Sequence, residues 1–222
     1  MNIIKSFFIA FAMYSEIPVP QFKWEEENMK YVFCFFPWVG AVIGLTEFIW
    51  FKVCSYLSIG DIAFVLFGTV IPFIITGGFH ADGFMDVSDA LCSYQNRERK
   101  LEILKDSRVG AFAVIKLLVY CIIYMAAFSE IRDKKSVLIL AVGFIISRCL
   151  SGILALWSKS ASEKSSLKKV RDASLKITVT AVLAVYMLIC LAAVIYLDVF
   201  TACIIFILLV LTVLAYRHKA YK

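Results

Sequence analysis

Long apolar runs separated by short polar segments dominate the pattern along this chain. A helix crosses the ~30 Å hydrocarbon core of a bilayer with about 20 mostly apolar residues, because each residue rises ~1.5 Å. Runs of this kind predict membrane-spanning helices over residues 31–53, 62–76, 109–128, 137–157, 177–197 and 199–216. We therefore expect an all-α polytopic bundle of about six or seven transmembrane spans, built as a single membrane domain over residues 1–222.

The pattern leaves some ends of the spans open. The run at 62–76 is short for a span unless Gly77 and Gly78 extend it. Only Asp198 separates the last two runs, which requires a tight turn or a broken pair of helices. Residues 3–14 are apolar but reach only about 18 Å as a helix. That segment predicts either an interfacial amphipathic helix or a short tilted span.

Composition and charge agree with a membrane protein. The chain is 62% hydrophobic and 18% charged, against roughly 45–50% and about 25% in soluble domains. Sixteen of the 23 Lys and Arg residues fall on one side of the predicted spans. Because cytoplasmic loops collect Lys and Arg, we expect that side to be cytoplasmic, in a multi-pass protein of the cell (inner) membrane. The net charge of +6 is then a topology signal, and nothing indicates a nucleic-acid-binding module.

Seven cysteines are spread through the chain at positions 34, 54, 92, 121, 149, 190 and 203. No two of them form a C-x-x-C pair, and most lie inside apolar runs. This spacing favours buried, unpaired cysteines over a disulfide or a zinc site.

The chemically informative segment is the loop at about 77–108, on the side expected to be cytoplasmic. If residues 82–92 are helical, Asp82, Asp86 and Asp89 stand at i, i+4 and i+7 on one face. Three such carboxylates at ~5–6 Å repel by a few kcal/mol per pair at an effective dielectric near ~20. They need a cation or must be protonated. An all-oxygen set suits a hard cation such as Mg²⁺, which shares its coordination with substrate phosphates.

The rest of the loop is less specific. A second short helix is expected to begin near Asn96, with Glu102 and Asp106 at i, i+4. A solvated mixed-charge helix explains residues 98–102 equally well. Arginines in the loop can bind phosphate oxygens with bidentate geometry. For His80, the residues alone leave three roles open: a general base, a neighbour of the metal, or an interfacial side chain.

Two basic residues stand inside predicted spans. Arg148 lies about ten residues from either end of an otherwise apolar span, where an arginine is costly and faces a partner or a cavity. A phosphate or the aspartate cluster would serve as that partner. Lys116 lies nearer the end of its span and can extend its side chain to the membrane surface.

Four segments together resemble one known family. They are FFIAFAMYSEIPVP (7–20), CFFPWVGAVIG (34–44), TGGFHADGFMDVSDAL (76–91) and KLEILKDSRVGAF (100–112). The Ser147-Arg148 pair in a membrane helix is a further match. On these segments the chain is similar, over about its first 160 residues, to the cobalamin synthase (adenosylcobinamide-GDP ribazoletransferase) family.

The resemblance implies a Mg²⁺-dependent membrane transferase that joins adenosylcobinamide-GDP to α-ribazole or its 5′-phosphate and releases GMP, completing cobalamin (vitamin B12) biosynthesis. Matched motifs then imply roles for seven residues. Asp82, Asp86, Asp89 and Asp106 would be metal ligands, Arg108 and Arg148 would bind substrate phosphate, and His80 or a carboxylate such as Asp82 would accept the hydroxyl proton. The substrates and the lipid bilayer are the expected partners, and oligomeric state is left open.

The chain departs from the family pattern at two places. Family members usually carry another cytoplasmic motif rich in Gly, Thr and Asp, followed by a final span, whereas this chain ends at Lys222 without either. We therefore expect a truncated or unusually short form. Glu16 also stands where a basic residue is expected. The loop at 159–176 matches poorly, and we assign it only a topological role or contact with anionic lipid or substrate.

Other functions remain as alternatives. A CDP-alcohol phosphotransferase would use similar in-line chemistry, and Asp82-Gly83 with Asp86 superficially suits it, but the longer Gly-spaced remainder of its motif is absent. A UbiA-type prenyltransferase would need a D-D-x-x-D run, which is also absent. A transporter would show inverted repeats and midplane sites, whereas these acids cluster in one surface loop.

Overall fold

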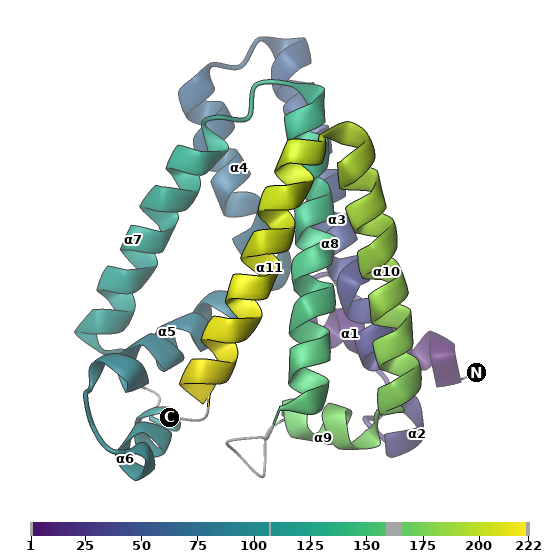
Figure 1. Ribbon diagram of the computed structural model, residues 1–222, viewed down its shortest axis with the longest axis vertical. Coiled ribbons are helices and arrows are strands. Elements are labelled where there is room, and N and C mark those ends of the chain that lie inside the picture. Colours follow the sequence, from purple (N-terminus) through teal and green to yellow (C-terminus); the bar gives the residue numbers. More distant parts are fainter. Residues whose placement is uncertain (1, 107, 159–165, 221–222) are drawn as a thin grey trace.

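The fold is an array of helices whose order follows the predicted spans. The computed structural model describes residues 2–106, 108–158 and 166–220, and every regular element in them is α-helical. The helices are α1 (Asn2–Tyr14), α2 (Glu26–Met29), α3 (Val32–Leu57), α4 (Asp61–Thr76), α5 (Phe79–Cys92), α6 (Arg97–Ile103), α7 (Ala111–Phe128), α8 (Lys134–Trp157), α9 (Ser166–Ala173), α10 (Lys176–Leu197) and α11 (Val199–Ala220) (Figure 1).

The predicted helical membrane bundle is confirmed, and five of the six predicted runs each form a helix of span length. Within the described residues, α3, α7, α8, α10 and α11 are each long and apolar enough to cross a membrane. Helix α4 reaches span length only if α5 is counted with it, and these two helices meet at an angle of 91°, as in a broken span or a re-entrant loop. The turn between α10 and α11 is made by Asp198, whose Oδ1 accepts the backbone N–H of Thr201 at 2.8 Å. Asp198 also pairs with Lys135 at the start of α8.

Helix α3 is the centre of the bundle and packs against α1, α4, α8 and α10. Its closest approach is to α8, along the face that carries Gly40 and Gly44. A Cβ on Gly40 would lie 2.5 Å from the carbonyl oxygen of Phe144, and one on Gly44 would lie 2.8 Å from Ala141. Small residues let two helix backbones approach this closely. The small-residue face of α3 therefore packs helices within the chain.

The bend between α4 and α5 depends on two glycines. Gly77 and Gly78 have φ of +59° and +75°, in the left-handed region that side chains with a Cβ disfavour. They end α4 instead of extending it, and the Gly78 N–H closes the helix on the Phe73 carbonyl at 3.0 Å. The Glu16 side chain lies against Gly77, and the backbone N–H of Glu16 donates to the Ile75 carbonyl at 2.9 Å. The segment before α2 thus holds the bend in place.

The polar elements gather at one end of the molecule. Figure 1 shows α2, α5, α6 and α9 toward the lower end, near the C-terminus, whereas the α3–α4, α7–α8 and α10–α11 connections lie at the upper end. This grouping is the one expected from the distribution of Lys and Arg. That the lower end faces the cytoplasm stays a prediction. The α1 helix packs on α2 and α3 near the same end, and part of the predicted 159–176 loop, residues 159–165, lies outside the described residues.

All seven cysteines are free thiols, and Cys34, Cys54, Cys149 and Cys190 are buried. They occupy positions in helices of the bundle, as their place in apolar runs indicated. Cys34 and Cys149 are part of the main hydrophobic core, with Phe33, Val39 and Ile43 of α3.

Candidate active site

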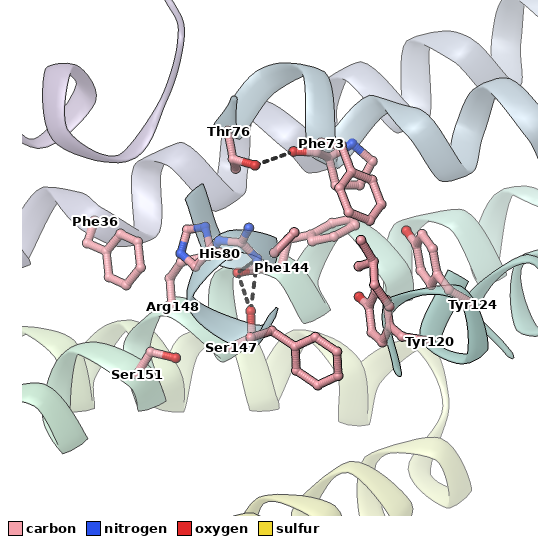
Figure 2. A pocket seen from close by; sticks show the side chains of 14 residues that line it. Phe36, Phe73, Thr76, His80, Tyr120, Tyr124, Phe144, Ser147, Arg148 and Ser151 are labelled. Atoms are coloured by element: carbon pink, nitrogen blue, oxygen red, sulfur yellow. Dashed lines mark hydrogen bonds between the residues drawn. The ribbon is translucent and has the colours of Figure 1, made fainter. Parts of the chain in front are cut away.

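A cavity of about 250 Å³ opens where α5 turns away from the bundle. Helices α3, α4, α5, α7 and α8 line it (Figure 2). Its polar lining consists of Thr76, His80, Tyr120, Tyr124, Ser147, Arg148 and Ser151, and its apolar lining includes Phe36, Phe73, Phe84, Leu117 and Phe144. The cavity brings His80 and Arg148, which are far apart in the sequence, to one place.

His80 stands in the first turn of α5, immediately after the bend. Its ring stacks on Phe36 of α3, with centroids 5.7 Å apart and planes 5° from parallel. The rings of Tyr14 and Phe79 flank the imidazole, with centroids 6.5 and 5.7 Å from its own. These contacts with α1 and α3 fix the imidazole at the cavity wall, where its ring nitrogens can exchange a proton with a bound group.

Arg148 lies mid-way along α8 and faces the cavity, as its place in an apolar span indicated. One guanidinium nitrogen, Nη1, donates to Ser147 Oγ at 3.0 Å and to the Phe144 carbonyl at 3.4 Å. The guanidinium also lies 5.4 Å from the Phe144 ring centroid. Its Nε–H is buried without a hydrogen-bond partner, and no carboxylate in the described residues forms an ion pair with Arg148. An anion entering the cavity would satisfy both its charge and its free donor.

Asp82 and Asp86 lie one turn apart on α5, beyond His80. Asp82 is exposed and Asp86 is half-buried. Partial burial and the charges of Asp82 and Asp89 raise the pKa of Asp86 above its ordinary value. In the described part of the chain neither Asp82 nor Asp86 makes a hydrogen bond or an ion pair through its carboxylate. The structure thus places two free carboxylates side by side, as the helical spacing predicted.

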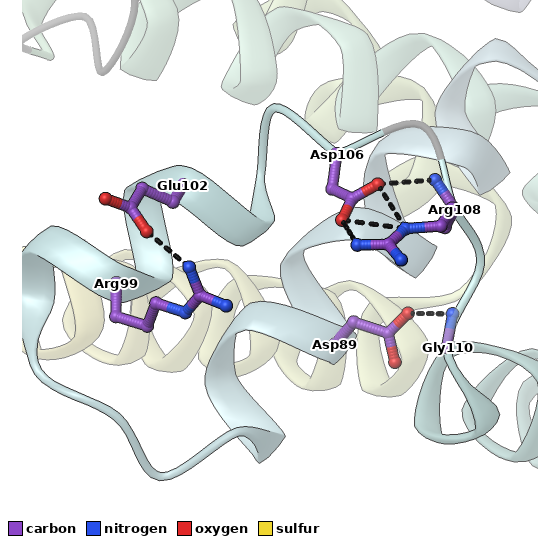
Figure 3. Close-up of polar contacts among 6 residues, drawn as sticks. All are labelled: Asp89, Arg99, Glu102, Asp106, Arg108 and Gly110. Atoms are coloured by element: carbon purple, nitrogen blue, oxygen red, sulfur yellow. Dashed lines mark hydrogen bonds and ion pairs between the residues drawn. The ribbon is translucent and has the colours of Figure 1, made fainter.

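Asp89 has a different environment from the other two. Its Oδ2 accepts the backbone N–H of Gly110 at 2.7 Å (Figure 3). Its Oδ1 accepts the backbone N–H of Ala113 at 2.8 Å. These two N–H groups lie at the start of α7, where backbone N–H groups have no partner within the helix. Asp89 therefore caps α7 from a neighbouring helix, and a metal-binding role for it stays a prediction.

Asp106 and Arg108 pair with each other beside this cap. The Arg108 Nε and Nη2 groups donate to the Asp106 carboxylate at distances of 2.6 to 3.1 Å, and the Arg108 backbone N–H also donates to it, at 3.0 Å (Figure 3). These bonds lower the pKa of Asp106 to about 2. Both side chains remain accessible from solvent. The predicted roles of Asp106 as metal ligand and of Arg108 as phosphate ligand stay predictions, and Ser107 between them is outside the described residues.

The short helix α6 begins where the sequence indicated, with Asn96 as its N-cap. It ends at Ile103, so the prediction that Glu102 and Asp106 share this helix is wrong. The Asn96 side chain accepts the Arg99 N–H at 3.0 Å, and Arg99 pairs with Glu102 one turn on (Figure 3). Both side chains of this pair are well exposed. The pairing fits a solvated mixed-charge helix, so we assign Glu102 no role in the site.

The donor groups fit Mg²⁺ as a two-carboxylate site. Among the described residues no three His, Cys, Asp or Glu side chains gather closely enough to hold a metal by themselves. Mg²⁺ in enzymes is commonly bound by one or two carboxylates, with waters and substrate phosphates completing the octahedron. Asp82 and Asp86, free and adjacent, match that pattern. The full set of four aspartates as Mg²⁺ ligands stays a prediction.

Several residues that line the cavity were not predicted as site residues from the sequence. Tyr120 and Tyr124 of α7 and Ser151 of α8 all line the cavity, and Ser147 does so beside Arg148. The signal was helical spacing: Ser147, Arg148 and Ser151 share one face of α8, and Tyr120 and Tyr124 share one face of α7. Sequence spacing does not show that these faces of α7 and α8 line the same cavity, so it could not assign them to one site.

Comparison with known proteins identifies the family of the chain. The family model described as Cobalamin-5-phosphate synthase matches residues 6–222. The chain belongs to this family. The match covers every helix that lines the cavity, and it continues to residue 222, beyond the motifs in the first 160 residues.

Curated relatives carry one name. A protein of Lachnoclostridium phytofermentans named adenosylcobinamide-GDP ribazoletransferase is 38% identical over 222 residues, covering 100% of this chain and 85% of the relative. One of Clostridium perfringens with the same name is 32% identical over 188 residues, covering 84% of this chain and 75% of the relative. One of Listeria monocytogenes is 36% identical over 135 residues, covering 60% and 54%. No solved structure gives a significant match.

Proposed function

We propose that this member of the cobalamin-5-phosphate synthase family is an adenosylcobinamide-GDP ribazoletransferase. It joins adenosylcobinamide-GDP to α-ribazole or α-ribazole 5′-phosphate, giving adenosylcobalamin or its phosphate and GMP. One observation carries the proposal: a cavity in which Arg148, without an ion-pair partner, and His80 meet. The same helix, α5, carries the carboxylates Asp82 and Asp86, which do not line the cavity. This combination suits transfer of a substituted phosphate group. The names of the relatives supply the substrates.

The reaction is an in-line displacement at phosphorus. A ribazole hydroxyl oxygen forms a bond to the cobinamide-linked phosphorus, and the bond from that phosphorus to the oxygen of the departing GMP breaks. The hydroxyl proton passes to His80 or to Asp82. Arg148 binds phosphate oxygens through its free Nε–H and its charge, which holds the phosphorus in place for attack.

The fixed position of His80 supports its role as proton acceptor. Stacking on Phe36 holds the imidazole against α3, so that the ring does not need to reorient for each turnover. Ser147 holds Arg148 by accepting from its Nη1, which leaves the Nε side of the guanidinium for the substrate. Arg108, which pairs with Asp106 at the end of the loop, would bind a second phosphate once Asp106 is displaced from it.

Asp82 and Asp86 would hold Mg²⁺, with Asp89 and Asp106 as further predicted ligands. When bound, Mg²⁺ supplies positive charge that offsets the charge developing on the GMP leaving group. The adjacent carboxylates support this assignment, because their mutual repulsion is relieved by a divalent cation.

The protein would work in the cell membrane with the α2, α5, α6 and α9 end in the cytoplasm. The concentration of Lys and Arg at that end supports this orientation. The corrin-containing substrate is large and polar, so it must approach from water. Three residues that line the cavity, Phe36, Thr76 and His80, lie at the start of α3, the end of α4 and the start of α5, which supports such an approach. Labelling of single cysteines at Ser93 and Tyr56 from either side of inverted vesicles would test the orientation.

The deciding experiment uses the full chain purified in nanodiscs. It is incubated with adenosylcobinamide-GDP, α-ribazole 5′-phosphate and Mg²⁺, and GMP release is followed with and without EDTA. GMP formed together with a cobalamin product, and abolished by EDTA, is the expected result. Turnover of CDP-linked lipids in place of the cobinamide substrate would overturn the proposal in favour of a CDP-alcohol phosphotransferase.

A further inference from the structure

The cavity has two ends of different chemistry (Figure 2). One end holds His80, Ser147, Arg148 and Ser151 from α5 and α8. The other is lined by aromatic rings from α4, α5 and α7. The ring centroids of Phe84 and Tyr120 lie 5.8 Å apart. Those of Tyr120 and Tyr124 lie 6.1 Å apart, with ring planes 9° from parallel. Such a wall offers ring faces and edges to a flat aromatic guest.

Two donors in this cavity are buried without a partner. The Tyr124 hydroxyl and the Arg148 Nε–H, one at each end, make no hydrogen bond with any described residue. A buried polar group without a partner destabilises the fold, so such groups point to something that binds there. A ligand that fits both must carry an acceptor atom on an aromatic ring and an anionic or strongly polar group on its other side.

We propose that this cavity is the acceptor site, and that it binds the benzimidazole base of α-ribazole at its aromatic end. The inference rests on the proposed function. The base is a flat bicycle with one unprotonated ring nitrogen, which accepts a hydrogen bond from Tyr124. The ribose or its phosphate then extends toward Arg148 and His80. This places the attacking hydroxyl at the polar end, where the proton acceptor lies.

Size excludes the other large group of the reaction. A cavity of about 250 Å³ takes a benzimidazole ring and part of a sugar, whereas the corrin macrocycle with its amide side chains is far larger. The corrin must therefore lie outside this cavity. The donor presents only its phosphates at the polar end.

The guanine of the donor is the competing occupant, since it too is a flat bicycle. Guanine carries an amide and an amino group, with several donors and acceptors on its edge. The aromatic end offers only the hydroxyls of Tyr120 and Tyr124 among its lining residues, with Phe73, Phe84 and Leu117 around them. Buried guanine groups would be left unpaired there, which costs binding energy. The benzimidazole base leaves none unpaired.

Glu47 gives a second account of the Tyr124 hydroxyl that the experiment must separate. Glu47 of α3 is fully buried, its carboxylate has no partner, and Tyr124 is within electrostatic range of both Glu47 and Arg148. Glu47 does not line the cavity. If Tyr124 serves only Glu47, removing its hydroxyl changes stability but not ribazole binding.

The experiment compares Tyr124→Phe and Phe84→Leu with wild type in nanodiscs. Equilibrium binding of α-ribazole alone is measured by isothermal titration calorimetry without donor or Mg²⁺. The KM values for α-ribazole and for adenosylcobinamide-GDP are then measured separately. Tyr56→Phe is the control, because Tyr56 is 88% exposed at the far end of α3 and does not line the cavity. Thermal melting reports whether each variant is folded.

We expect Tyr124→Phe to weaken α-ribazole binding and raise its KM by about tenfold, with the KM for the donor within about twofold of wild type. Phe84→Leu should act in the same direction through lost ring contact, and it keeps the proposal testable if Tyr124→Phe is unstable. A raised KM for the donor alone would assign the aromatic end to guanine and overturn the proposal, as would unchanged α-ribazole binding in both folded variants. Wild-type protein that binds α-ribazole but releases no GMP would sink the proposed function and leave the site standing.

Discussion

Asp89 and Gly110 are joined by a hydrogen bond of 2.7 Å that links α5 to the first residue before α7. Gly110 occupies the N-cap position of α7 and has no side chain with which to cap it. Asp89 supplies the missing oxygen, and its second oxygen binds the Ala113 N–H. A carboxylate at a helix N-terminus also interacts favourably with the helix dipole. The acidic helix and the tyrosine-bearing helix of the cavity are thereby held in a fixed relation.

This relation predicts that Asp89→Ala destabilises the protein. Loss of an N-cap costs about 1–2 kcal/mol, so the melting temperature in detergent should fall by several degrees. Gly110→Ala should have a similar effect, because its Cβ would lie 2.6 Å from the Asp89 carboxylate oxygens. Asp61→Ala is the control, since the Asp61 side chain is 87% exposed and its one ion pair, from Oδ2 to Arg132 Nη1, is long at 3.7 Å. Unchanged melting of Asp89→Ala, with a weakened response to Mg²⁺, would instead return Asp89 to the metal site.

The helices could be predicted from the sequence because each is set by local properties. Span length, the helical spacing of the three aspartates and the Asn96 cap all act within one segment, and the structure confirms each. The close packing at Gly40 and Gly44 needs only small residues at those positions, but the identity of the partner helix, α8, comes from the structure. A single Asp198 between two long apolar runs required a tight turn, and its own carboxylate makes that turn.

The site could be predicted only in part, because its geometry depends on which helices are neighbours. Gly77 and Gly78 permit either a longer α4 or a sharp bend, and contact with the segment around Glu16 accompanies the bend. Asp89 looks like a third metal ligand by spacing, yet a carboxylate serves equally well as a cap once α7 lies beside it. Tyr120 and Tyr124 lie in an apolar run, and nothing within that run indicates that they share a cavity with Arg148 of α8.

Helix packing beside Arg148 gives a second prediction. A Cβ on Gly40 would lie 2.5 Å from the Phe144 carbonyl oxygen and 2.9 Å from Cδ of Arg148. Gly40→Ala must therefore separate α3 from α8 or displace the arginine, at a cost of about 1–3 kcal/mol. We expect a lower melting temperature together with a lower kcat. Gly143→Ala on α8 is the matched control, because its Cβ would meet nothing within 4 Å. Equal melting and activity for the two variants would show that α3 and α8 do not approach as described.

The free carboxylates on α5 give a third prediction. Asp82→Asn and Asp86→Asn each remove one charge from a site that has only two adjacent, unpaired carboxylates. The Mg²⁺ concentration needed for half-maximal GMP release should rise about tenfold or more in each. Glu102→Gln on α6 should leave it unchanged, because Glu102 is exposed and pairs with Arg99. Full activity of Asp82→Asn at wild-type Mg²⁺ would refute the metal assignment.

Arg148 gives the fourth prediction, in which stability and activity move in opposite directions. Its guanidinium is placed in an apolar span with a buried, unpartnered Nε–H and no ion pair among the described residues. An intramembrane arginine without an ion-pair partner points to an anionic ligand. Arg148→Met, which preserves length and removes the charge, should therefore raise the melting temperature and lower kcat/KM by about 100-fold or more. Lys116→Met is the control, since Lys116 is exposed on α7 and does not line the cavity, and it should leave kcat/KM unchanged. If Arg148→Met instead lowered the melting temperature and kept full activity, the arginine would be structural and the phosphate would have to bind elsewhere.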